Sequence, residues 1–413
     1  MTIILTFAFW SGAFTGITGL NFLIFITTIL IFIINITQKI LHLDASHTIN
    51  YKKISPTEIE DKKMKSLSLK RQHILKTIKI GKDQIQINMQ TFIPQTINKK
   101  KKNVILIHGF CSTSFLAFGN ALPLITKYFN TYLLDLPGFG RSYASSKIHK
   151  KKNHEIISFY VECINQLRLH NNINTAIYIA HSYGGFLTTH YAHKYGKYIS
   201  HLYLLDSTGF LPILGKYGAF WGFIFKIFIP NLLFSLTQVA RIIEINSFHF
   251  NPKLQYILHI LSSHQTWGNN TLANFITITF KTCHWNTPVL IELAKLNCPV
   301  CLIYGSNDTI MPPLQGKVLS KILNIQFHQV ANCFHSPLSE GDVPALLKFI
   351  HSNKIKTIPS TPELTHSTIK QLRDFMNITT SYFHIKKTQK CLDDFYNNLP
   401  KFFSQFSSPS SRK

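Results

Sequence analysis

The chain has 413 residues, and its 43 Lys or Arg against 18 Asp or Glu give a formal net charge of +25. A chain of this length can bury one large core and still carry appendages. The basic balance alone does not indicate a nucleic-acid-binding protein, because no recognition motif and no aromatic-lined basic stretch accompanies it. It fits either a surface held against anionic lipid or a general enrichment in lysine. The seven cysteines are scattered and odd in number, which argues against a disulfide framework.

The first 38 residues contain no charged side chain, and residues 22–34 are apolar apart from two threonines. About 20 apolar residues cross a bilayer, so the sequence predicts a membrane anchor over residues 1–38. Glycines at positions 12, 16 and 19 leave open one tilted helix or a short hairpin, and a cleaved signal peptide is the alternative. Lysines begin only at Lys39, so the positive-inside rule predicts, for a single span, that the rest of the chain is cytoplasmic. We expect residues 39–72 to form a basic linker.

Strand and helix patterns alternate over residues 73–354, which predicts an α/β domain with a mostly parallel sheet covered on both faces. Its first element is an antiparallel hairpin over residues 74–80 and 85–92, whose second strand alternates apolar and polar residues. An apolar strand over residues 104–107 then leads into His108-Gly109-Phe110. A strand-to-turn block with the sequence DLPGFGRS follows at residues 135–142.

The apolar strand predicted over residues 176–180 runs into His181-Ser182-Tyr183-Gly184, and a helix pattern follows. A serine between a strand and a helix lies on a sharp turn that exposes its hydroxyl, as in the G-x-S-x-G nucleophile elbow. Ala180 replaces the first glycine of that motif and is still small. Ser182 is therefore the candidate nucleophile.

A long insertion covers residues 209–288, and its first part, residues 210–234, is strongly apolar. We expect a helical lid here, in contact with the core and with lipid or an acyl chain. Two later strands are each followed by a chemically active side chain: Asp308 comes after residues 300–304, and His335 after residues 325–330. Residues 355–413 are expected to form a C-terminal helical extension and tail.

The chain order Ser182, Asp308, His335, together with the loop at residues 108–110 and the block at residues 135–142, resembles the serine branch of the α/β-hydrolase superfamily. The chain is loosely similar to lipid-acting lipases and acyl hydrolases of that superfamily. The resemblance implies a catalytic triad of these three side chains, with the backbone N–H groups of Phe110 and Tyr183 as the oxyanion hole.

Two features of the pattern leave alternatives open. Asp206 ends the strand before the insertion, where some members of the superfamily carry their acid, so it is the alternative to Asp308. Relatives with acyltransferase activity carry the element H-x-x-x-x-D, whereas His335 is followed at that spacing by Glu340. The sequence therefore favours hydrolysis over acyl transfer.

These features together predict a membrane-anchored serine hydrolase that cleaves an acyl-lipid ester through an acyl-enzyme on Ser182. The alternatives are hydrolysis of a thioester or C–C bond on the same fold, and a catalytically inert membrane scaffold. We expect no cofactor and no metal, because the sequence shows no metal-ligand cluster and no phosphate-binding loop. The expected partners are the membrane and its lipid or acyl-ester substrate, and not nucleic acid.

Overall fold

The computed structural model describes residues 56–110, 112–210, 276–279, 282–285, 289–308, 310–352 and 355. The predicted membrane anchor, the first half of the predicted linker, most of the predicted lid and nearly all of the C-terminal extension lie outside the described residues. Within the residues that are described, no helix is both long and apolar enough to cross a membrane.

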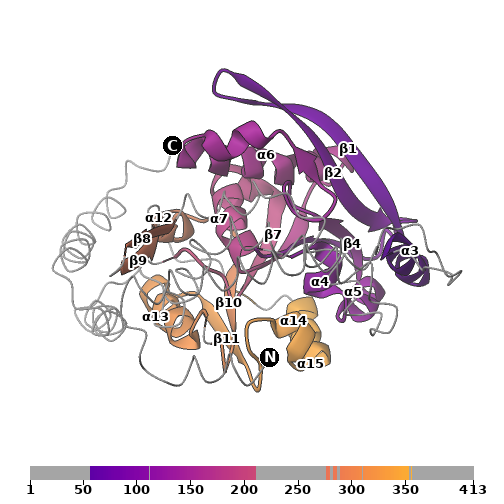
Figure 1. Ribbon diagram of the computed structural model, residues 1–413. Helices are drawn as coiled ribbons and strands as arrows, with labels where there is room; N and C mark the ends of the chain where they lie inside the picture. Colours follow the sequence, from indigo (N-terminus) through magenta and orange to yellow (C-terminus); the bar gives the residue numbers. More distant parts are fainter. Residues whose placement is uncertain are drawn as a thin grey trace, which may run out of the picture. The chain divides into compact units, whose positions relative to one another are not determined.

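The main sheet has the strand order β1-β2-β4-β3-β6-β7-β10-β11, with the short strand β5 paired to β2 (Figure 1). Strands β4, β3, β6, β7, β10 and β11 run parallel, and β1 and β2 form an antiparallel hairpin at one edge. The strands are β1 Leu69–Ile80, β2 Asp83–Pro94, β3 Lys102–Ile107, β4 Phe129–Leu134, β5 Tyr143–Ala144, β6 Ala176–His181, β7 Ile199–Leu205, β10 Val300–Gly305 and β11 Gln326–Val330.

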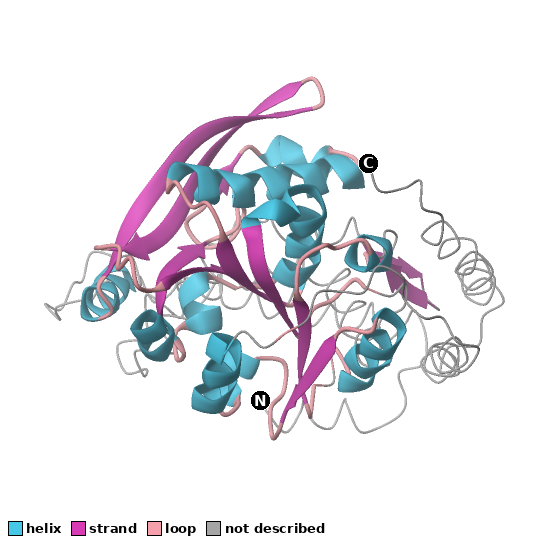
Figure 2. Cartoon of the chain, turned by 180° about the vertical axis from the view of Figure 1, so that it is seen from behind, coloured by secondary structure: helices cyan, strands magenta, loops and turns pink. Residues whose placement is uncertain are grey.

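Helices cover both faces of this sheet, as Figures 1 and 2 show. One face is covered by α6 Asn153–His170, α7 Tyr183–Tyr195, α12 Leu290–Ala294 and α13 Pro313–Leu323. The other face is covered by α3 Pro56–Ser66, α4 Ser114–Phe118, α5 Leu122–Tyr128, α14 Pro337–Glu340 and α15 Val343–Ser352. Two short 3-10 turns, η1 Ser146–Lys150 and η2 Gly196–Tyr198, precede α6 and follow α7.

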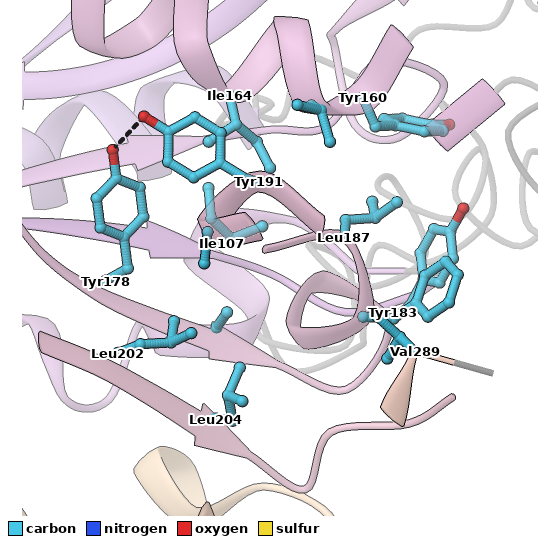
Figure 3. Close-up of a cluster of buried hydrophobic side chains, with 14 of the residues drawn as sticks. Ile107, Tyr160, Ile164, Tyr178, Tyr183, Leu187, Tyr191, Leu202, Leu204 and Val289 are labelled. Atoms are coloured by element: carbon cyan, nitrogen blue, oxygen red, sulfur yellow. Dashed lines mark hydrogen bonds between the residues drawn. The ribbon is translucent and has the colours of Figure 1, made fainter. Parts of the chain in front are cut away.

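The central strands are mostly apolar, above all toward their carboxyl ends, because these parts are buried on both faces. In β3, Ile105 and Ile107 enter the core beneath α6 and α7, and Val104 and Leu106 enter the core on the opposite face. Figure 3 shows part of the first core, where the hydroxyls of Tyr178 and Tyr191 are hydrogen-bonded at 2.9 Å. The predicted α/β architecture, a mostly parallel sheet with helices on both faces, is confirmed.

The N-terminal hairpin begins earlier than the sequence pattern predicts, at Leu69, and helix α3 precedes it within the range predicted as a linker. The polar start of β1 concealed this strand, because Arg71 forms ion pairs with Glu60 and Asp61 of α3 instead of packing into the core. The second strand is half-buried as predicted near its turn, where Ile85 is buried and Gln86 is exposed.

Part of the predicted helical lid is a β-hairpin. Strands β8 Ile276–Thr279 and β9 Thr282–Trp285 pair antiparallel and form a separate two-stranded sheet. The first sequence, ITIT, consists of β-branched residues, and the second, TCHW, has a threonine and a tryptophan; both residue classes favour strands. The prediction of a helical lid is therefore wrong for these two segments, and the apolar run at residues 211–234 lies outside the described residues.

Candidate active site

Four loops meet at the carboxyl edge of the parallel sheet. They follow β3, β6, β10 and β11, and they carry Phe110, Ser182, Asp308 and His335 respectively. Because parallel strands end at the same edge, residues far apart in the sequence are brought together there. This edge is where the predicted site residues lie.

Ser182 forms the sharp turn between β6 and α7. Its backbone has φ +52° and ψ −121°, a conformation that costs a non-glycine residue about 1–3 kcal/mol and is held only by its surroundings. The N–H of Ser182 donates to the carbonyl of Leu205 at 2.9 Å, and its own carbonyl accepts from Gly185 at 2.9 Å. A Cβ at Gly184 would lie 2.4 Å from the carbonyl oxygen of His108, so the motif's last glycine is required by close backbone packing.

Ser182, His335 and Asp308 form one line of hydrogen bonds. The Nε2 atom of His335 lies 3.0 Å from Ser182 Oγ, and Nδ1 lies 2.7 Å from Asp308 Oδ2. The other carboxylate oxygen of Asp308 accepts from the backbone N–H groups of Ile310 and Met311 at 2.7 and 2.8 Å. Asp308 is buried and His335 is one-fifth exposed, so the imidazole is fixed from behind and open at the serine. The structure thus brings the three predicted side chains together.

The loop predicted to hold the oxyanion lies directly against the serine. A Cβ at Gly109 would lie 2.9 Å from Ser182 Cβ, so only a glycine allows this approach. His108 fixes the loop from below: its Nε2 accepts from the N–H of Leu136 at 2.9 Å, so Nδ1 carries the proton and donates to the carbonyl of Gly109 at 2.7 Å. Complete burial lowers the pKa of His108 to about 4, which keeps the ring neutral and preserves this pair of bonds.

This arrangement sets the direction of one predicted oxyanion donor. The carbonyl of Gly109 and the N–H of Phe110 belong to one planar trans peptide, so they point in opposite directions. The hydrogen bond to His108 therefore fixes the orientation of the Phe110 N–H as well. The second predicted donor, the N–H of Tyr183, is at the first residue of α7, and the rings of Phe110 and Tyr183 pack edge to face at 6.5 Å.

The alternative acid, Asp206, lies at the same site but in a different environment. It is fully buried, and its Oδ1 accepts from the N–H of Gly305 at 2.8 Å. Its Oδ2 has no hydrogen-bond partner among the described residues. Burial, and next the nearby carboxylate of Asp308, raise the pKa of Asp206 well above its ordinary value of 3.8. The hydrogen bond to His335 is made by Asp308, and Asp206 favours its neutral form.

His181, which directly precedes the serine, is a site residue that the sequence reasoning did not single out. Its Nε2 donates to the backbone carbonyl of His335 at 2.6 Å, so it links the end of β6 to the loop that carries the imidazole. Burial, followed by the nearby His335, lowers the pKa of His181 to about 3, which favours the neutral ring. The position of His181 directly before the candidate nucleophile could have indicated a role in the site, although the sequence does not show where its ring points.

His181, Asp206 and His335 each offer one metal-ligand atom, and these atoms lie within 4.8 Å of one another. Both ring nitrogens of His335 are already engaged, with Ser182 and with Asp308. The hydrogen-bonded triad therefore accounts for His335 in this cluster.

The block at residues 135–142 supports the site from behind. Asp135 is buried and accepts hydrogen bonds from the N–H of Ser114 at 2.8 Å and from Gln90 Nε2 at 3.1 Å. Arg141 forms an ion pair of 2.6 Å with Glu60 of helix α3. These two residues therefore order loops, and Glu60 could not be anticipated because α3 was not predicted.

Comparisons with known proteins agree with this arrangement. A family model described as the alpha/beta hydrolase fold matches residues 102–228. Abhydrolase domain-containing protein abhd-5.2 from Caenorhabditis elegans is 34% identical over 116 residues, 28% of this chain and 26% of that protein. The 1-acylglycerol-3-phosphate O-acyltransferase ABHD5 from Rattus norvegicus is 34% identical over 110 residues, which are 27% of this chain and 30% of that protein. The chain thus spans less than a third of the length of these two relatives.

One relative is matched over most of its length. Pimeloyl-[acyl-carrier protein] methyl ester esterase from Wigglesworthia glossinidia brevipalpis is 23% identical over 265 residues, 60% of this chain and 92% of that protein. Among solved structures, lip1 from Acinetobacter baumannii AYE superposes with a TM-score of 0.52 at 18% identity, covering 74% of this chain and 100% of that one. The sheet order, the loops at its carboxyl edge and these matches together show that the chain has the α/β-hydrolase fold.

Proposed function

We propose that the protein is a membrane-anchored serine hydrolase that cleaves a carboxylic ester of an acyl lipid through an acyl-enzyme on Ser182. The observation that carries the proposal is the continuous hydrogen bonding from Ser182 Oγ through His335 to Asp308. A serine hydroxyl is a weak nucleophile at neutral pH and needs an adjacent base, which this geometry supplies.

In the first half of the reaction, Ser182 Oγ attacks the carbonyl carbon of the ester while its proton passes to His335 Nε2. Asp308 accepts the Nδ1–H of the same ring, so it holds one tautomer and stabilises the imidazolium that forms. The carbonyl oxygen becomes an oxyanion, which the N–H groups of Phe110 and Tyr183 bind, at about 3 kcal/mol for each donor. The imidazolium then gives its proton to the departing alcohol oxygen, and the C–O bond breaks to leave the acyl-enzyme.

In the second half, His335 Nε2 takes a proton from a water molecule that attacks the acyl carbonyl. The second tetrahedral intermediate collapses, the acid is released, and the proton returns to Ser182 Oγ. No step needs a metal or a cofactor.

Four features support an acyl lipid as the substrate and a membrane as the location. The predicted anchor at residues 1–38 holds the chain at a bilayer, and the apolar run at residues 210–234 follows the strand that ends beside the triad. The lysines after Gln38 favour a cytoplasmic domain. The esterase relative that is matched over 92% of its length acts, by its name, on a methyl ester of an acyl chain, which supports a carboxylic ester here.

Acyl transfer to an alcohol is the second candidate, and the name of the Rattus norvegicus relative favours it. The element expected in such transferases is altered, because Glu340 takes the place of its aspartate. In the structure, Glu340 Oε2 accepts the backbone N–H of Phe334 at 2.9 Å and so holds the loop that carries His335. A carboxylate that supports this loop is compatible with hydrolysis and with acyl transfer. The two reactions differ in what accepts the acyl group from Ser182, which is water in hydrolysis and an alcohol in transfer.

The test is a substrate panel on the purified full-length chain in detergent micelles. We expect release of free fatty acid from mono- and diacyl lipid esters, with kcat/KM rising as the acyl chain lengthens. Ser182→Ala should abolish release, and Ser306→Ala, which alters a serine on the loop before Asp308, should leave it unchanged. Formation of a new ester when a monoacyl lipid is added would assign acyl transfer. Turnover of thioesters or C–C substrates alone, or of none of these, would contradict the proposal.

A further inference from the structure

The β1–β2 hairpin extends past the carboxyl edge of the sheet, on the side where the triad lies. Strand β2 runs antiparallel to β4, with Thr91 opposite Leu134 and Phe92 opposite Leu133. Residues of β2 that precede Thr91 therefore continue beyond the last residue of β4, and the turn at residues 81–82 is the farthest point. In Figure 1 this turn lies beside α6, well away from α3 at the other end of the hairpin.

The turn is held against the start of α6. Asp83 forms an ion pair with Lys151, and a Cβ at Gly81 would lie 2.7 Å from the carboxylate of Glu155. The turn, η1 and the first residues of α6 therefore form one surface, although they come from two distant parts of the chain. Helix α6 precedes β6 and runs antiparallel to it, so its first residues also lie at the carboxyl edge.

This surface carries a group of exposed lysines, which we call the carboxyl-edge lysines. Each of them has an exposed side chain, and within the described part of the chain none forms an ion pair: they are Lys79, Lys82, Lys147, Lys150 and Lys152. The two acidic groups between them, Asp83 and Glu155, are occupied by Lys151 and by the backbone N–H of Lys152. Tyr143, which is 54% exposed, lies next to them opposite Asn88 of the hairpin.

Edge-strand protection does not account for this group. Lysines along β1 can serve to keep an edge strand from pairing with another chain, which explains Lys70 and Lys76. The lysines of η1 and Lys152, the N-cap residue of α6, are not on an edge strand, and yet they lie on the same surface as the turn. A cluster of positive charge with an exposed tyrosine beside it is the composition that binds at an anionic bilayer interface.

We infer that the carboxyl-edge lysines form a docking surface for a bilayer that contains anionic phospholipid. The inference rests on the proposed function, because a bilayer bound here faces the edge that carries Ser182 and so presents acyl esters to the triad. Each lysine beside the anionic surface strengthens binding about five-fold, which corresponds to about 1 kcal/mol. Salt weakens this attraction, because these lysines are exposed.

The experiment measures acetylation rates of individual lysines by mass spectrometry on the full-length chain mixed with phosphatidylcholine vesicles, with or without phosphatidylserine. Any insertion of residues 1–38 is the same in both samples, so the comparison isolates the effect of anionic lipid. We expect Lys82 and Lys150 to react at least about five-fold more slowly when phosphatidylserine is present, and to recover at high salt. Lys99 and Lys100 are the internal controls, because they are exposed in the loop before β3, at the opposite edge of the sheet.

Matched variants extend the test. Replacing three carboxyl-edge lysines (Lys82→Gln, Lys147→Gln, Lys150→Gln) should abolish the protection of the two that remain, Lys79 and Lys152. The same change of charge at the opposite edge (Lys99→Gln, Lys100→Gln, Lys127→Gln) should preserve it. Labelling of Ser182 by a fluorophosphonate in detergent reports whether each variant is folded.

Three results would overturn the inference: equal acetylation rates with both vesicles, protection of Lys99 and Lys100 instead, or protection by duplex DNA and not by vesicles. A chain that shows the expected protection but no labelling of Ser182 would contradict the proposed function and leave the docking surface in place.

Discussion

Two carboxyl groups lie beside the imidazole of His335, and their hydrogen-bonding surroundings differ. Asp308 accepts hydrogen bonds at both oxygens, from His335 and from two backbone N–H groups. Asp206 accepts one, from Gly305, and it is buried next to another carboxylate. At the scale of single residues, Asp308 is therefore the acid that holds His335, and Asp206 favours its neutral form.

Replacing each of these acids by asparagine should separate their roles. Asp308→Asn removes the acceptor that holds the Nδ1–H of His335, so kcat should fall on the order of 10³–10⁴-fold. Asp206→Asn closely resembles the neutral acid and retains an oxygen for the N–H of Gly305, so kcat should change less than about ten-fold. Steady-state hydrolysis of a soluble ester measures both. The opposite ranking would move the acid of the triad to the end of β7.

The same substitution at Asp206 should change how stability depends on pH. An acid whose pKa is raised in the fold keeps its proton after the unfolded chain has lost it, so its contribution to stability is lost as pH rises above the ordinary value of 3.8. Asparagine does not titrate. The Tm of Asp206→Asn relative to the parent chain should therefore be higher at pH 8 than at pH 4.5, as measured by thermal unfolding. A difference that is constant across this range would show that Asp206 is ionised in the fold.

At the scale of elements, the site depends on backbone-to-backbone packing between the elbow and the loop after β3. Gly184 and Gly109 allow this packing, because a Cβ at either position would lie less than 3.0 Å from the other segment. His108 joins the same loop to the block after β4. A change of one methyl group at this contact should therefore disturb both the fold and the oxyanion hole.

Two glycines of one chain segment provide a matched test. Gly184→Ala should destabilise the fold by about 1–3 kcal/mol or more, since the carbonyl oxygens of His108 and Ile107 lie 2.4 and 2.8 Å from the new carbon. Gly196→Ala, at the other end of α7, meets nothing within 4 Å and has helical φ and ψ. It should stabilise the fold by about 0.4–1 kcal/mol, because alanine lowers the conformational entropy of the unfolded chain. Equal effects in chemical unfolding would contradict the close approach at the elbow.

The elements that sequence reasoning predicted correctly are those with a strong local pattern. The strands before Ser182 and Asp308 are apolar on both faces and end at small or turn-forming residues, so their positions follow from hydropathy alone. Helix α3 and the start of β1 have no such pattern, because each buries only one or two apolar residues and they are also joined by ion pairs between Glu60, Arg71 and Arg141. The contacts of His181 and the neutral state of Asp206 depend on burial, which only the folded chain defines.

At the scale of the whole molecule, the described domain begins with α3 and not with the sheet. Glu60 of this helix is buried between Arg71 of β1 and Arg141 of the block behind the active site. Removing one partner of such a buried charge cluster is costly, because the remaining charges lose their compensation. The helix therefore belongs to the domain, and the predicted anchor can be separated from it only before residue 56.

Two truncations test this boundary. A chain that begins at residue 56 should fold, because every described element is retained, and a chain that begins at residue 69 should be less stable by about 3–5 kcal/mol or fail to fold. Thermal unfolding of the two chains makes the comparison. Similar Tm values would show that α3 is not part of the domain.

The chain that begins at residue 56 also tests the predicted anchor. The full-length chain is expected to resist carbonate extraction, since an apolar span is not released by charge screening, and the truncated chain should lose this resistance.

The most direct test of the account is covalent labelling of the full-length chain with a lipid-like fluorophosphonate, which reacts only with an activated serine. The account predicts stoichiometric labelling of Ser182, located by peptide mass spectrometry. It also predicts no labelling of Ser182→Ala, labelling slowed on the order of 10³-fold or more in His335→Ala, and normal labelling of Ser306→Ala. Labelling that persists in Ser182→Ala, or an unreactive but folded parent chain, would contradict the assignment of Ser182 as the nucleophile.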